Sequence, residues 1–216
     1  MARTRVKICG IRDEDAAAWA VESGADAIGL VFVPGSPRRV RSEDARTLMY
    51  TQPPMITVVG VVANLSVDAF VELEQECPCQ VWQLHGNEDD ATVRACGPGV
   101  IKAIGFDPET IDAEVERWSA MPEVSGLLVD NAKAGSGEPI DWAALRAALD
   151  RVEAIGQELP PVFLAGGLTP DTVGEAIRTV RPWGVDVSSG VESERGVKDR
   201  DLIRAFCDAV QSADAS

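Results

Sequence analysis

The sequence predicts an α/β protein, a single (β/α)8 TIM barrel with parallel strands. Eight short apolar segments alternate with eight amphipathic ones along the 216 residues. The apolar segments are nearly continuous, which is typical of parallel strands covered by helices. Eight such units in roughly 200 residues match the size of a closed barrel. An open doubly wound sheet is the alternative, but it would carry a G-x-G-x-x-G motif after an early strand, and none is present.

The elements can be placed one by one, and together they form one domain over residues 1–216. Strands are expected at 6–10, 27–33, 56–62, 80–84, 100–105, 126–129, 162–165 and 184–188. Helices are expected at 13–23, 42–50 and 66–76, then from about Asn87, Asp107, Asp141 and Thr169, and finally at 199–210. Ser42 and Ser66 are predicted helix caps. A short tail at about 211–216 is expected to be loose.

Charge and composition exclude several classes of function. The formal net charge is -15, from 20 Lys and Arg against 35 Asp and Glu, so neither nucleic acid nor an anionic membrane is an expected partner. The first five residues carry no apolar leader segment, and no apolar run is long enough to cross a membrane. The five cysteines lack the spacing of a disulfide framework or a metal site. We therefore expect a cytoplasmic protein without a metal.

The first predicted strand carries a thiol to the barrel rim. Because strand side chains alternate, Lys7 and Cys9 share the face that points into the barrel, and Cys9 comes last before Gly10. An ammonium near a thiol favours the reactive thiolate. The alternative is that Cys9 is a small buried hydrophobic residue.

The last two strands end in small residues that suit a phosphate site. Gly166 and Gly167 follow the seventh strand, and Ser188, Ser189 and Gly190 follow the eighth. Loops at these two positions commonly bind phosphate in this fold through backbone N–H groups, and the two hydroxyls are candidate donors. Two ordinary tight turns are the alternative.

Other polar residues are predicted at the same rim. Arg38 can hold a planar carboxylate with two hydrogen bonds, or it is a solvated arginine beside Arg39. Asp130 ends an apolar strand, a placement that suits a general acid. Asp186 lies deeper, as a structural partner for Lys7. Gln83 and His85 end the fourth strand, and a lone histidine there is as often structural as catalytic.

Five motifs resemble phosphoribosylanthranilate isomerase of tryptophan biosynthesis. They are Lys7-Ile8-Cys9-Gly10-Ile11, Ser36-Pro37-Arg38, Gln83-Leu84-His85-Gly86, Leu164-Ala165-Gly166-Gly167-Leu168, and Asp186-Val187-Ser188-Ser189-Gly190-Val191-Glu192 with Lys198-Asp199. They occur in order from about Lys7 to Phe206.

The resemblance implies an Amadori rearrangement without a cofactor. N-(5'-phosphoribosyl)anthranilate would become 1-(2-carboxyphenylamino)-1-deoxyribulose 5-phosphate, with Asp130 as general acid and Cys9 as general base. Arg38 would hold the anthranilate carboxylate, and the loops at Gly167 and Ser188–Ser189 the phosphate. Lys7, Gln83, His85, Gly166 and Gly190 complete the expected substrate-binding set. We expect a monomer or a weak homodimer.

Two positions depart from the family pattern. Val62 stands where the family usually has phenylalanine, and the loop 131–137 after Asp130 is shorter than usual. Three other functions have different sequence requirements. A bifunctional isomerase would have aspartate in place of Cys9, and indole-glycerol-phosphate synthase would have a lysine-rich rim. A non-catalytic phosphoribosyl-binding barrel is the alternative outside catalysis, and the presence of both Cys9 and Asp130 argues against it.

Overall fold

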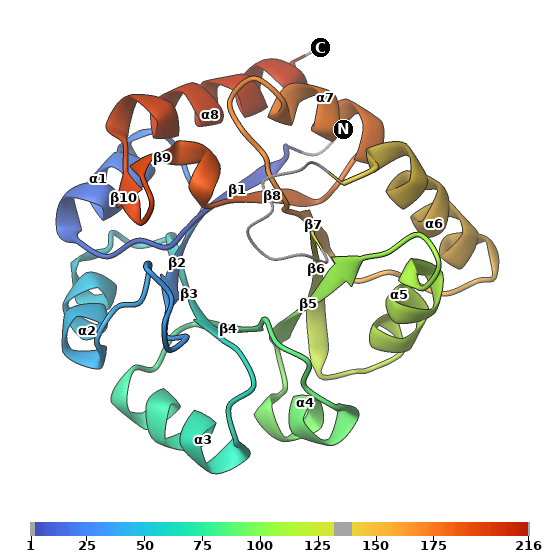
Figure 1. Ribbon diagram of the computed structural model, residues 1–216, viewed down its shortest axis with the longest axis horizontal. Helices are drawn as coiled ribbons and strands as arrows, with labels where there is room; N and C mark the ends of the chain where they lie inside the picture. The colour runs from blue at the N-terminus through green and yellow to red at the C-terminus, as the bar shows by residue number, and fades with distance from the viewer. Residues whose placement is uncertain (1–2, 132–139, 216) are drawn as a thin grey trace.

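Eight parallel strands close into one barrel, as the sequence predicts. A computed structural model describes residues 3–131 and 140–215. Each strand pairs with the next in chain order, and β8 returns to pair with β1 (Figure 1). The strands are β1 (Arg5–Cys9), β2 (Ala27–Val31), β3 (Thr57–Val62), β4 (Val81–Leu84), β5 (Val100–Phe106), β6 (Val124–Asn131), β7 (Val162–Leu164) and β8 (Gly184–Val187).

The helices form a ring outside the barrel (Figure 1). They are α1 (Glu14–Glu22), α2 (Ser42–Thr51), α3 (Val67–Glu76), α4 (Asp90–Cys96), α5 (Ile111–Ser119), α6 (Trp142–Ala154), α7 (Val173–Val180) and α8 (Arg200–Asp214). Five of them start at a side chain that accepts a hydrogen bond from a backbone N–H of the first turn, and these caps are Asp13, Ser66, Asp89, Asp141 and Asp199. Such caps satisfy N–H groups that have no partner within the helix.

The core has an outer and an inner part. The larger part lies between strands and helices, where residues such as Ile8, Ile28 and Leu30 are fully buried. Val62 belongs to this outer part, so its side chain packs under the helices. The barrel interior is filled by two smaller clusters. One consists of Ile101, Ala103, Leu128 and Ala165, and the other of Cys9, Val31 and Val61. This interior is a packed core, as expected for the fold.

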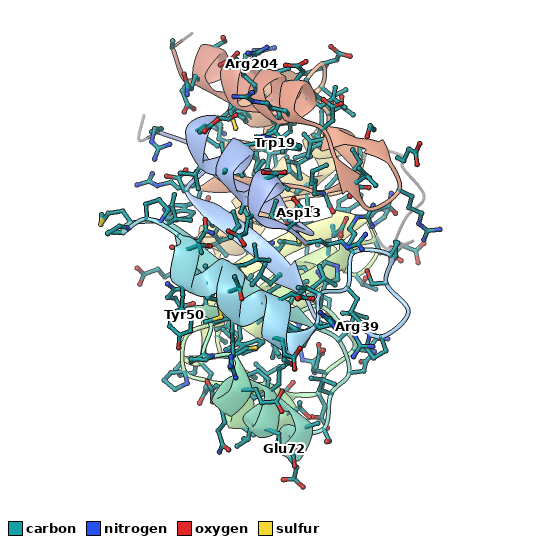
Figure 2. All side chains as sticks on the ribbon, turned by 90° about the vertical axis from the view of Figure 1, so that its left-hand side faces the viewer. Asp13, Trp19, Arg39, Tyr50, Glu72 and Arg204 are labelled. Carbon is teal, nitrogen blue, oxygen red and sulfur yellow. The ribbon has the colours of Figure 1, made fainter. Side chains whose placement is uncertain are left out.

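Parallel strands place all of their carboxyl ends on one face of the barrel. Figure 2 shows Arg39, in the loop after β2, on the right, and Tyr50, near the far end of α2, on the left. The loops that follow the strands therefore gather at the right-hand face in that view. Within the described residues, no helix is long and apolar enough to cross a membrane.

Several segments differ from the sequence-based expectation, among them the following three. Residues 211–214, expected in a loose tail, form the last turn of α8, and Asp214 accepts hydrogen bonds from the Thr4 amide and hydroxyl. The helix expected from Thr169 starts at Val173, after a turn. A 3-10 turn η1 (Ser189–Val191) and a small hairpin, β9 (Glu192–Glu194) with β10 (Val197–Lys198), follow β8 and were not predicted.

Candidate active site

Lys7 lies inside the barrel in a buried network. Its Nζ lies 3.0 Å from Asp186 Oδ1 and 2.9 Å from Gln83 Oε1. The expected pairing of Lys7 with Asp186 is confirmed. Burial disfavours the ammonium, but the neighbouring Asp186 carboxylate and Cys9 outweigh burial and raise the Lys7 pKa. Lys7 therefore remains a cation within the barrel.

Cys9 ends β1 beside Val31 and Val61. Burial raises the pKa of the Cys9 thiol above its ordinary value, and the ammonium groups of Lys7 and Lys198 offset only part of this effect. Lys7 lowers the pKa of the Cys9 thiol, as expected, but burial raises that pKa by more. Gly29 on the adjacent strand leaves room for the thiol, since a β-carbon there would lie 2.8 Å from Cys9 Sγ.

Asp130 contacts the chain's single histidine. His85 Nε2 lies 3.3 Å from Asp130 Oδ2, and the Asn131 amide donates to Asp130 Oδ1 over 2.7 Å. The other imidazole nitrogen, Nδ1, lies 2.7 Å from Gln83 Nε2. Asp130 and His85 are both partly exposed. The ends of β4 and β6 thus bring a carboxyl group and an imidazole together, as their strand-end positions predict.

The loops after β7 and β8 meet at the rim. Gly166 and Gly167 have φ angles of 82° and 71°, a region that favours glycine. Gly190 lies so close to Leu168 O that a β-carbon there would overlap that oxygen. The Ser188 hydroxyl donates to Cys9 O over 3.1 Å. A hydroxyl has only one proton to donate, and in this structure Cys9 O accepts it. The expected role of Ser188 as a donor to phosphate stays a prediction.

These loops line a cavity of about 630 Å³ at the carboxyl ends of the strands. Its wall includes six of the predicted site residues, namely Arg38, Asp130, Gly166, Gly167, Ser188 and Ser189. Lys7 and Gln83 were expected to bind substrate. Both are buried, and the Gln83 amide is bonded at both ends within the protein. Neither residue belongs to the cavity wall, and the expectation that they bind substrate stays a prediction.

An ion-pair cluster at the rim was missed by the sequence analysis. Glu192 accepts two hydrogen bonds from Arg38 and one from Lys198 Nζ. The Gly196 amide donates a further one to Glu192. Burial disfavours the carboxylate, but these donors outweigh it and lower the Glu192 pKa to about 2. The sequence offered one indication of this cluster, because Glu192 and Lys198 both belong to the last of the five motifs.

A second buried ion pair shapes the loop after β4. Lys102 Nζ lies 2.8 Å from Glu88 Oε2 and also donates to Gly86 O. The Glu88 carboxylate accepts from the backbone amides of Asn64 and Gly86. The helix expected from about Asn87 would include Glu88, but this residue lies before α4 and is buried. The pair fixes the loop that follows His85.

Comparison with known proteins identifies the family. The family model for N-(5'phosphoribosyl)anthranilate (PRA) isomerase matches residues 6–209. This chain belongs to the PRA isomerase family. It is 41% identical to the N-(5'-phosphoribosyl)anthranilate isomerase of Hahella chejuensis, over 94% of this chain and 92% of that protein. The PRA isomerase fold is shared with solved structures as well.

The phosphoribosyl anthranilate isomerase of Thermotoga maritima superposes with a TM-score of 0.84 at 37% identity, over 97% of this chain and 99% of that one. A second PRA isomerase structure contains reduced 1-(o-carboxyphenylamino)-1-deoxyribulose 5-phosphate. It has a TM-score of 0.82 at 36% identity and covers the same shares of the two chains.

Two further expectations from the sequence concern the loop after Asp130 and the absence of a metal. Residues 132–137 of the shortened loop after Asp130 lie outside the described residues. In the described part of the chain, no group of three or more His, Cys, Asp or Glu side chains is placed to hold a metal ion.

Proposed function

We propose that this PRA isomerase, an enzyme of tryptophan biosynthesis, works by acid–base catalysis with Asp130 and Cys9. The observation that carries the assignment is that both groups lie at the carboxyl ends of barrel strands, and therefore on the same face of the barrel. Asp130 lines the cavity at the end of β6, and Cys9 ends β1, where the Ser188 hydroxyl ties it to the loop that lines the same cavity. A carboxyl group and a thiol are suited to proton transfer when held at a substrate.

In the first step Asp130 gives its proton to the ring oxygen of the ribose. The ring C–O bond breaks, and the anthranilate nitrogen supplies the electron pair that forms an iminium ion. The N–H groups of His85 and Asn131 face the two oxygens of Asp130. They are in place to stabilise the carboxylate that remains after proton transfer.

In the second step the Cys9 thiolate removes the proton from C2'. The C–H electron pair moves toward the iminium and gives an enolamine, which tautomerises to the ketone. The raised pKa of Cys9 leaves a smaller fraction as thiolate at neutral pH, but it makes each thiolate a stronger base. The Lys7 and Lys198 ammonium groups limit that rise.

Two sets of donors are proposed for the negative ends of the substrate. Glu192 occupies the Nε–Nη2 edge of Arg38, so an anthranilate carboxylate would bind along the Nη1–Nη2 edge, which a guanidinium also offers. The loops at Gly166–Gly167 and Ser189–Gly190 would bind the phosphate through backbone N–H groups. Glu192 thus orients the arginine that faces the cavity.

Conversion of freshly prepared N-(5'-phosphoribosyl)anthranilate, followed by the loss of its fluorescence, tests this function. We expect turnover by the purified chain without added metal or cofactor. Binding of the phosphorylated substrate without turnover would instead assign a non-catalytic phosphoribosyl-binding barrel and overturn the proposal. Heat-treated protein provides the control for spontaneous breakdown of the substrate.

The assembly and compartment are proposed on separate grounds. Tyr50 and Met55 are large hydrophobic residues that are 81% and 96% exposed. A relative from Thermotoga maritima is described as dimeric. A monomer or weak homodimer remains our prediction, which sedimentation at several protein concentrations would test. All five cysteines are free thiols, which supports a reducing compartment such as the cytoplasm.

A further inference from the structure

A continuous chain of polar contacts crosses the barrel interior beneath the cavity. It runs from Asp186 Oδ1 to Lys7 Nζ over 3.0 Å, and from Lys7 Nζ to Gln83 Oε1 over 2.9 Å. It continues from Gln83 Nε2 to His85 Nδ1 over 2.7 Å, and from His85 Nε2 to Asp130 Oδ2 over 3.3 Å. The ammonium of Lys7 also interacts with the Cys9 thiol. The chain therefore links the neighbourhood of the proposed base to the proposed acid.

Gln83 is the central member, and it is 0% exposed. Its neighbours inside the barrel include apolar residues such as Ile101 on the adjacent strand. A buried amide costs free energy unless it is hydrogen-bonded, and both ends of this amide are bonded to side chains. Because Gln83 lies between the Lys7 ammonium and the His85 imidazole, these two neighbours determine which end of its amide donates and which accepts.

Only one arrangement of hydrogens satisfies this chain. The Lys7 ammonium can only donate, so the Gln83 atom facing it is the carbonyl oxygen. The amide nitrogen must then donate to His85 Nδ1, which therefore carries no proton. The ring proton is placed on Nε2, where it points to Asp130 Oδ2.

We propose that Gln83 is a positioning residue that transmits the orientation of the Lys7–Asp186 ion pair to His85. It holds the imidazole as the Nε2–H tautomer, which donates a hydrogen bond to Asp130. The proposal rests on the proposed role of Asp130 as general acid. In the opposite tautomer, a bare Nε2 would face the carboxylate oxygen, and the hydrogen bond that stabilises Asp130 after proton transfer would be lost.

The chemistry at position 83 distinguishes glutamine from its nearest isostere. In Gln83→Glu, the new carboxylate still accepts from Lys7, but its second oxygen can only accept from His85. Nδ1 must then carry a proton. The substitution keeps the side-chain shape and reverses the direction of the hydrogen bond between residue 83 and His85 Nδ1. Gln83→Met removes both polar contacts and serves as the second variant if the buried carboxylate prevents folding.

Nitrogen-15 NMR of the imidazole gives a direct test, because the sequence contains a single histidine and all ring signals come from it. At mildly alkaline pH, we expect a protonated Nε2 and an unprotonated Nδ1 in the wild type. We expect a protonated Nδ1 in Gln83→Glu, and a mixture of tautomers in Gln83→Met. In both variants kcat should fall by about 10-fold or more while KM changes little, the effect expected when the group that orients an imidazole is removed. Gln80→Met, just before the opposite end of the same strand, is the matched control and should leave the imidazole signals and kcat unchanged.

A wild-type imidazole protonated on Nδ1, or one whose tautomer is unaffected in both Gln83 variants, would overturn the proposal. An inverted tautomer with full kcat would overturn its catalytic part. The NMR readout does not depend on turnover. If Asp130→Asn were fully active while the wild-type tautomer is as expected, the acid assignment would fail and the positioning of His85 would stand.

Discussion

The carboxylate of Glu192 holds the guanidinium of Arg38 by two hydrogen bonds, with Nε 2.7 Å from Oε1 and Nη2 2.8 Å from Oε2. These residues are 154 positions apart in the chain, and their contact joins the loop after β2 to the hairpin after β8. Lys198 Nζ lies 2.8 Å from the same carboxylate and also donates to Ser188 O. One buried carboxylate therefore organises three segments at the rim of the cavity.

Glu192→Gln should destabilise the protein by about 3 kcal/mol, because it leaves Lys198 and Arg38 without their anion in a mostly buried setting. Urea unfolding measures the change. Glu22→Gln is a matched control, since Glu22 also pairs with an arginine but both groups are exposed. It should cost less than about 1 kcal/mol. Equal effects of the two substitutions would contradict the role of Glu192.

Stability should decrease in acid through the same residue. The pKa of Glu192 is lowered from 4.5 to about 2 in the folded protein, so the folded state favours the ionised form. Its contribution is complete above the unfolded pKa and is lost as pH falls from about 4.5 toward 2. The free energy of unfolding, measured across this range, should fall less steeply in Glu192→Gln. Identical slopes would show that other carboxylates account for the acid sensitivity.

Gly190→Ala should weaken substrate binding. A β-carbon at this position would overlap Leu168 O, so the loops after β7 and β8 must move apart. We expect KM to rise by about 10-fold or more, which corresponds to about 1.4 kcal/mol, with a smaller change in kcat. Gly174→Ala is the control, because its β-carbon would have only ordinary contacts on α7. An unchanged KM in Gly190→Ala would argue against a phosphate site at these loops.

Lys7→Met should shift the pH dependence of the reaction. The Lys7 ammonium lowers the pKa of Cys9, while burial raises it. Without Lys7, the thiol pKa rises further, so the rising limb of kcat/KM against pH should move to higher pH. Activity at alkaline pH should therefore recover relative to activity at neutral pH. A profile reduced equally at every pH would show that Lys7 acts on the structure and not on the thiol.

Much of the barrel follows from local sequence patterns. Strands buried on both faces are largely apolar, which is why a strand was expected at 100–105, where β5 (Val100–Phe106) lies. The strand β6 extends beyond the predicted 126–129, because Val124 pairs with Val100 and the polar residues Asp130 and Asn131 still pair with β5. The hairpin β9–β10 was not predicted, since its two strands are very short and polar.

The sequence predicted the site residues that lie at strand ends. It did not predict the ion pairs that these and other residues form with distant parts of the chain. Cys9, His85 and Asp130 could be placed because parallel strands bring their carboxyl ends to one face. The pairs Arg38–Glu192 and Lys102–Glu88 join separate loops or strands, so no local pattern reveals them. The competition between burial and the Lys7 charge at Cys9 also depends on the packed structure.

The central claim is that Asp130 and Cys9 transfer the protons. It is tested most directly by measuring turnover and ligand affinity together in the wild type, Cys9→Ser and Asp130→Asn. Reduced 1-(o-carboxyphenylamino)-1-deoxyribulose 5-phosphate, found in a related structure, is the ligand for the affinity measurement. We predict a loss in kcat of about 10²- to 10⁴-fold in each variant, with the dissociation constant within about 3-fold of wild type. Full turnover in either variant, with the ligand still bound normally, would contradict the role assigned to that residue.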